Sequence, residues 1–134
     1  MFQAWLTFAI FDNARRAHLG IPLELHELSV TDRSNRAEVL GDLNPARRVP
    51  TLVLDDDRSL AESNAILWYF GDGSRFVPDD PYGRAQVLQW QFWEQYEHEP
   101  AIAVARFLRT YSGRPDVWEK RRARLAAEGE RALA

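Results

Sequence analysis

Short runs of apolar residues in the first half of the chain predict β-strands. Leucines alternate with glutamates and a histidine over 23–28, which is the pattern of a half-buried strand. A continuous apolar run at 51–54 precedes a turn of aspartates, and residues 59–61 can return from that turn as a second strand. The segment 1–11 is also apolar, and we interpret it as buried structure, either strand or helix.

Helical spacing lies between and after these strands. A mixed apolar and charged segment at 12–19 ends at a glycine, which suits a helix C-cap. A short helix at 37–43 must stop before an Asn-Pro pair, because the residue before a proline disfavours helical backbone. Ser63 is the expected N-cap of a third helix at 64–70.

The pattern changes in the second half of the chain. A stretch rich in proline and aspartate at 77–81 is the best domain boundary, and only helical spacing follows it. Apolar residues recur at intervals of three and four along the first long segment, which Pro100 should kink or restart. We therefore predict an α/β lobe at 1–76, a linker at 77–81 and an all-α region at 82–134.

Composition narrows the class of function. The chain has 134 residues, 17 of them basic and 20 acidic, and its formal net charge of −3 without a basic stripe disfavours binding to nucleic acid or to an anionic membrane. Cysteine is absent, so disulfides, cysteine-ligated zinc and thiol nucleophiles within the chain are excluded. The three histidines show no metal-ligand spacing, so we expect no metal site. No apolar run approaches the roughly 18 residues that a membrane span requires.

Two motifs lie close together in the first lobe. They read Asn-Pro-Ala-Arg-Arg-Val-Pro-Thr-Leu-Val-Leu at 44–54 and Leu-Ala-Glu-Ser-Asn-Ala-Ile at 60–66. At this spacing they resemble the glutathione-binding core of the glutathione S-transferase family, and segments at 85–90 and 94–96 are similar to the start of that family's helical domain. The resemblance implies a thioredoxin-like βαβαββα lobe followed by part of an all-α C-terminal domain, truncated because the family's later helices are missing.

The resemblance further implies that the Val49–Pro50 peptide bond is cis. In that geometry the Val49 N–H and C=O would turn outward and pair with an extended tripeptide, so the cysteinyl part of glutathione is expected there. From the residues alone the alternative is a trans proline at a strand start, because X–Pro bonds are cis only about 5% of the time. Arg48 is expected either to meet the glycyl carboxylate of glutathione or to stay solvated.

Glu62 and Ser63 stand at the start of the third predicted helix, whose free N–H groups and dipole favour an anion. The resemblance implies that the Ser63 hydroxyl donates to the α-carboxylate of the γ-glutamyl end of glutathione and that Glu62 accepts from its α-ammonium. From the residues alone, Ser63 is equally well only a helix cap and Glu62 only a surface acid. The predicted glutathione site therefore consists of Arg48, Val49, Pro50, Glu62 and Ser63.

The residue that would activate the glutathione thiol is unknown. Members of the resembled family place a Ser, Tyr or Cys near the end of the first strand or the start of the first helix, where a donor lowers the pKa of that thiol. In residues 1–28 the only hydroxyl side chain is that of Thr7, which we interpret as a core or helix residue. Residues 2–11 also lack any Gly, Pro or Ser that could turn a strand into a helix, so we expect the first strand to be lost or replaced.

Two further side chains carry open alternatives. Arg106 lies on an otherwise apolar helical stretch, where it can approach an acidic co-substrate, pair with Glu99 or reach solvent. His98 lies between two glutamates and is either a buried polar group near the substrate cleft or a solvated one.

The resemblance implies the function of a glutathione transferase, in which the thiolate of glutathione attacks a small, apolar electrophile. The alternatives are a non-catalytic glutathione-binding or protein-interaction module of the same fold, and a truncated, inactive chain. Glutathione is the expected co-substrate. A homodimer in the cytoplasm is also implied, and the absence of cysteine is compatible with that compartment.

Overall fold

The computed structural model describes residues 2–6, 20–29, 32–113 and 116–134, with side chains from residue 20 onward. The chain forms two compact units, Met1–Val77 and Pro78–Ala134. Within the described ranges, none of the helices has the length and apolar character needed to cross a membrane.

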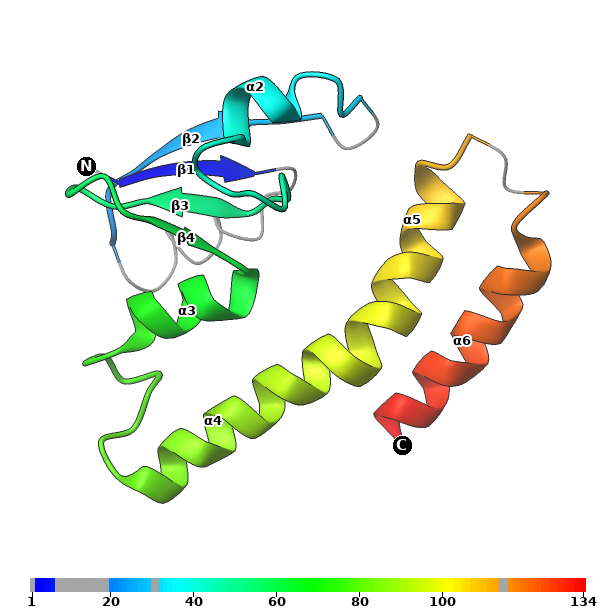
Figure 1. Cartoon of the computed structure of the whole chain (residues 1–134). Coiled ribbons are helices and arrows are strands. Elements are labelled where there is room, and N and C mark those ends of the chain that lie inside the picture. Colours follow the sequence, from blue (N-terminus) through cyan, green and yellow to red (C-terminus); the bar gives the residue numbers. More distant parts are fainter. Residues whose placement is uncertain (1, 7–19, 30–31, 114–115) are drawn as a thin grey trace. The chain divides into compact units, whose positions relative to one another are not determined.

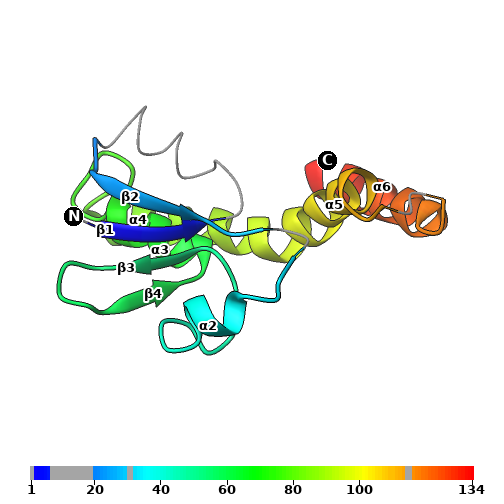
Figure 2. The ribbon, with the colours of Figure 1, turned by 90° about the horizontal axis from the view of Figure 1, so that it is seen from above.

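The first unit is built on a four-stranded sheet with the strand order β2-β1-β3-β4 (Figure 1). Its strands are β1 (Phe2–Leu6), β2 (Leu23–Glu27), β3 (Thr51–Val53) and β4 (Ser59–Ala61). β1 pairs in parallel with β2, whereas β3 pairs antiparallel with both β1 and β4. Figure 2 shows the four strands side by side in this order.

The expectation that the first strand is lost is wrong, because β1 is present in the sheet. β1 lies in the middle of the sheet, between β2 and β3. Central strands tend to read as near-continuous apolar runs, and the apolar segment 2–11 therefore shows no strand end in the sequence. The helix expected at 12–19 and the side chain of Thr7 lie outside the described residues.

Apolar side chains of the sheet and of α3 (Ser63–Gly71) form the core of the first unit. Leu23, Leu52, Leu54 and Ile66 are buried and make one cluster. Burying a side chain of this size contributes about 1.5–3 kcal/mol. The β3–β4 hairpin and α3 are therefore held on the same core, which positions the turn that joins β4 to α3.

A short helix, α2 (Arg36–Leu40), ends earlier than the apolar spacing predicts. Leu40 is fully buried, and the buried guanidinium of Arg36 donates from Nη2 to the Ser29 carbonyl at 3.0 Å. Burial lowers the pKa of the Arg36 guanidinium, and the positive charge of Arg33 lowers it further. Arg36 thus ties α2 to the segment that precedes it.

The described part of the second unit is helical. Its elements are α4 (Pro81–Trp93), the π-helix η2 (Glu94–Ala103), α5 (Val104–Thr110) and α6 (Glu119–Leu133). α4 begins at a capped end, where the Asp80 carboxylate accepts from the Gly83 N–H at 2.8 Å. The backbone stays helical across both junctions, so α4, η2 and α5 form one continuous run (Figure 1).

Of the kink or restart expected at Pro100, the restart is wrong. The proline lies inside η2, and the backbone remains helical on both sides of it. A proline removes the donor of one helical hydrogen bond and crowds the preceding turn. Here the proline lies in a π-helical segment. Such segments are one of the known ways in which a helix departs from regular α-helical geometry without ending.

α6 packs against η2, and Gly129 of α6 lies beside Ile102 of η2; Leu125 and Gly129 are both buried. A Cβ added at Gly129 would lie 2.9 Å from Cγ1 of Ile102. The close approach of the two helices therefore requires a residue without a side chain at position 129.

Candidate functional site

The loop that leads into β3 is organised by Asn44, whose side chain is buried. Its Nδ2 donates to the Arg48 carbonyl at 2.9 Å and to Oγ1 of Thr51 at 3.1 Å, while its Oδ1 accepts from the Ala46 N–H at 3.0 Å. The Thr51 hydroxyl in turn donates to the Arg48 carbonyl at 2.9 Å. Asn44 and Thr51 belong to the motif recognised in the sequence, but their bracing role was missed, because buried and exposed asparagines look alike in a sequence.

The braced loop presents Val49 and Pro50, whose peptide bond is cis. Both residues are half-buried. In the described part of the chain, the Val49 N–H and C=O take part in no hydrogen bond. A backbone segment of this kind can accept an added extended peptide. The Arg48 side chain is exposed, and only its carbonyl is engaged in the loop.

The pairing of β3 with β4 brings the two sequence motifs to the same end of one hairpin. Thr51 is the Cα partner of Ala61 in this antiparallel pair. Pro50 precedes Thr51 directly, and Glu62 follows Ala61 directly. The loop before β3 and the turn after β4 are therefore neighbours in space, although eleven residues lie between Pro50 and Glu62 in the sequence.

Glu62 adopts a backbone conformation that is unusual for a residue with a side chain. Its φ is 71° and its ψ is 124°, and its side chain is exposed. A positive φ in a residue other than glycine costs on the order of 1–3 kcal/mol, and such residues gather at ligand sites. The strain at Glu62 therefore marks the β4–α3 turn as a candidate binding element.

Ser63 is the first residue of α3, not its N-cap, and the sequence prediction is wrong on this point. The N-cap is Glu62, which makes no side-chain capping bond. The first N–H that bonds within the helix is that of Ile66, which donates to the Glu62 carbonyl at 3.0 Å. The half-buried Ser63 hydroxyl forms no hydrogen bond to the described residues. The start of α3 thus combines a hydroxyl with the positive end of a helix, which suits an anion.

The other sequence candidates belong to the second unit. His98 is half-buried, with its Nδ1 4.0 Å from Oε1 of Glu94 and its ring 5.6 Å from that of Trp93. Arg106 is exposed and pairs neither with Glu99 nor with any other side chain that the structure describes. The described residues contain no group of three or more potential metal ligands.

Comparisons with known proteins identify the family. The family model described as the N-terminal domain of glutathione S-transferase matches residues 15–72. Glutathione S-transferase U10 of Arabidopsis thaliana is 33% identical over 97 residues, which are 68% of this chain and 40% of the relative. The chain therefore spans less than half the length of this curated relative.

Solved structures give the same result for the fold. A glutathione S-transferase from Pseudomonas fluorescens is 38% identical, with a TM-score of 0.86 over 98% of this chain and 68% of its own. A second family member from the same organism, with two glutathione molecules bound, is 23% identical and shares the fold, with a TM-score of 0.73 over 98% of this chain and 62% of its own. The first unit is thus a thioredoxin-like domain followed by a helical region, and the chain belongs to the glutathione S-transferase family.

Proposed function

We propose that this chain binds glutathione at the paired ends of the β3–β4 hairpin and conjugates its thiol to a small, apolar electrophile. The observation that carries the proposal is the pairing of Thr51 with Ala61. It makes neighbours of Val49, which offers a backbone edge, and Ser63, which offers a helix start. A neighbour with the same fold holds glutathione, which supports this choice of ligand.

Glutathione offers a complementary group to each element of the site. The Val49 N–H and C=O pair with the backbone of its cysteinyl residue, as an added strand does. The Ser63 hydroxyl and the first turn of α3 take the γ-glutamyl α-carboxylate, and Glu62 accepts from the α-ammonium. Arg48 meets the glycyl carboxylate or stays in solvent.

In the conjugation step the thiolate sulfur forms a bond to an electrophilic carbon of the co-substrate. With a chloro-nitroaromatic substrate, the carbon–chlorine bond breaks, chloride leaves with the bonding pair, and the thiol proton goes to solvent. The reaction is faster when a donor lowers the pKa of the thiol.

A second candidate function is a glutathione-binding module without catalysis. It is favoured by the lack of Ser, Tyr and Cys in residues 1–28, where Thr7 is the only hydroxyl side chain. Both candidates need the same binding site, and they differ only in turnover.

Calorimetry with glutathione, together with turnover of a chloro-nitroaromatic, tests both candidates on the full chain. Binding with turnover supports the transferase, binding alone supports the module, and no binding overturns both. Ser63→Ala should weaken glutathione binding by roughly tenfold, since it removes one hydrogen bond to a carboxylate. Ser59→Ala is the matched control, because Ser59 lies at the opposite end of β4 and is exposed.

The remaining assignments rest on the family resemblance. We propose a glutathione-binding lobe at 1–76, a linker at 77–81 and part of an all-α domain at 82–134. We also propose a homodimer in the cytoplasm, with neither nucleic acid nor membrane as a partner.

A further inference from the structure

A groove lies between α5 and α6, and the lining residues that the structure describes all belong to the second unit. It is open to solvent and has a volume of about 580 Å³. Small side chains make room for it on both helices, with Ala105 on α5 and Ala123 and Ala126 on α6. The groove is therefore large enough for a small molecule rather than only a few waters.

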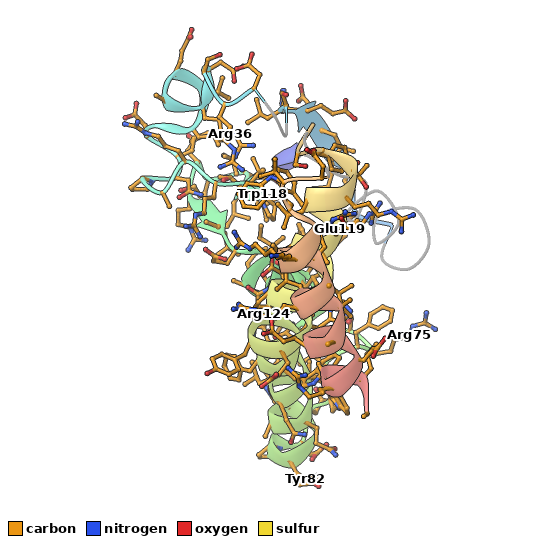
Figure 3. All side chains as sticks on the ribbon, turned by 90° about the vertical axis from the view of Figure 1, so that its right-hand side faces the viewer. Arg36, Arg75, Tyr82, Trp118, Glu119 and Arg124 are labelled. Carbon is orange, nitrogen blue, oxygen red and sulfur yellow. The ribbon has the colours of Figure 1, made fainter. Side chains whose placement is uncertain are left out.

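Positive charge dominates the lining of this groove. Arg106 and Arg109 lie one turn apart on α5, and Arg122 lines the groove from α6. Among the described lining residues, Glu119, in the first turn of α6, is the one acidic side chain. Figure 3 labels this glutamate near the start of α6. Guanidinium groups suit oxyanions because they form paired, charge-assisted hydrogen bonds with them.

The two arginines of α5 do not take part in the polar interactions that hold the described helices together. Arg106 and Arg109 are exposed, and neither forms a hydrogen bond or an ion pair with the residues that the structure describes. By contrast, Arg124 on α6 pairs with Glu128, with 3.2 Å between Nε and Oε1. Like charges that share a groove repel one another, and a bound anion removes that repulsion.

The start of α6 also favours a negatively charged ligand in the groove. Its N-cap is Trp118, which has no side chain able to cap the helix and makes no capping bond. The positive end of the helix dipole therefore lies beside the groove, where it favours negative charge.

From these observations we propose that the groove binds a compact small molecule with two or more negative charges, of the phosphate or polycarboxylate type. The described lining residues of this groove belong to the second unit, whereas the residues of the proposed glutathione site belong to the first. Glu119 opposes such a ligand, so its charge limits the affinity.

Calorimetry on the full chain at constant ionic strength tests this proposal. Inorganic pyrophosphate and citrate serve as probes for the two kinds of oxyanion, and acetate serves as a singly charged control. Binding of either probe, with acetate at least tenfold weaker, is the expected result, and the stronger of the two identifies the chemistry. Failure of both probes to bind at millimolar concentration overturns the proposal.

Substitutions in the groove should both weaken and strengthen binding of the probes, depending on the charge that is removed. The double variant Arg106→Gln/Arg109→Gln should weaken probe binding by at least tenfold. Glu119→Gln should strengthen it about threefold, because it removes the opposing charge. Arg124→Gln, which changes a paired arginine on another face of α6, should leave it unchanged. Equal losses in the double variant and in Arg124→Gln, or weaker binding in Glu119→Gln, would overturn the proposal.

The two proposed sites are separable in the same measurements. Ser63→Ala should weaken binding of glutathione but leave binding of pyrophosphate or citrate unchanged. Thermal unfolding followed by circular dichroism checks that each variant retains its fold.

Discussion

Asn44 donates from Nδ2 to Oγ1 of Thr51 at 3.1 Å, and both side chains are buried. Each also donates to the carbonyl of Arg48, the residue just before Val49. The loop of the candidate site is thus held from both of its ends by polar groups whose hydrogen bonds are satisfied internally. Such a buried network stabilises the fold when every polar group has a partner. It destabilises the fold when the loss of one member leaves another polar group buried without a partner.

Asn44→Ala should therefore lower the free energy of unfolding by about 2–3 kcal/mol, because it leaves the Thr51 hydroxyl and the Arg48 carbonyl with fewer partners. Urea unfolding followed by circular dichroism measures this change. Asn35→Ala is the control, since Asn35 is exposed and its side chain makes no capping bond. Its effect should stay within about 0.5 kcal/mol, and equal effects of the two variants would contradict the bracing role.

Glu62→Gly should make the fold more stable and glutathione binding weaker. Glycine adopts a positive φ without strain, so the free energy of unfolding should rise by about 0.5–1 kcal/mol. The variant also removes the carboxylate proposed to meet the α-ammonium of glutathione. Urea unfolding and calorimetry with glutathione measure the two effects.

Asp57→Gly is the matched control for that variant. Asp57 has a φ of 65° in the β3–β4 turn, at the opposite end of the hairpin from Glu62. It should gain stability similarly but bind glutathione unchanged. A loss of binding in Asp57→Gly, or normal binding in Glu62→Gly, would show that Glu62 contributes no specific contact.

The sheet shows which parts of the fold are readable in the sequence. The strands predicted at 51–54 and 59–61 are confirmed to within a residue, because an apolar run and its return flank an aspartate-rich turn. β1 is not readable, since a central strand and a buried helix segment give similar apolar runs. The restart expected at Pro100 is wrong, because propensity assigns a break there while the backbone stays helical on both sides of the proline.

The candidate site is readable only in part. Motif recognition finds Val49 and Ser63, but the register that makes their segments neighbours is a property of strand pairing. The capping rule assigns the N-cap to Ser63, whereas the strained backbone of Glu62 moves the helix start by one residue. A strained φ has no sequence signal in a glutamate, so this feature required the structure.

The turn between β3 and β4 should respond to acid through Asp56. Its carboxylate accepts from Nε of Arg58 at 2.8 Å, and this hydrogen bond holds the pKa of Asp56 below its ordinary value. A carboxyl group with a lowered pKa adds stability above its unfolded pKa of about 3.9 and loses it as the pH falls through the folded value. The turn should therefore loosen only below about pH 4.

NMR titration of the Asp56 carboxyl measures this effect. The midpoint should lie below 3.9 and should rise toward that ordinary value in Arg58→Gln. Arg75→Gln should leave it unchanged, because Arg75 lies over the ring of Phe76 instead. An Asp56 midpoint that does not move in Arg58→Gln would contradict the assigned cause.

Gly129→Val should destabilise the second unit, although helix propensity alone predicts the opposite sign. Valine places a Cβ 2.9 Å from Cγ1 of Ile102, so α6 must move away from η2 or Ile102 must shift. Overpacking of this kind costs about 1–3 kcal/mol, whereas replacing a helical glycine gains only a few tenths. Ala127→Val, at an exposed position of α6, should cost about 0.5 kcal/mol. Urea unfolding should therefore rank Gly129→Val as the less stable variant, and the reverse order would mean that α6 does not pack on η2 at this distance.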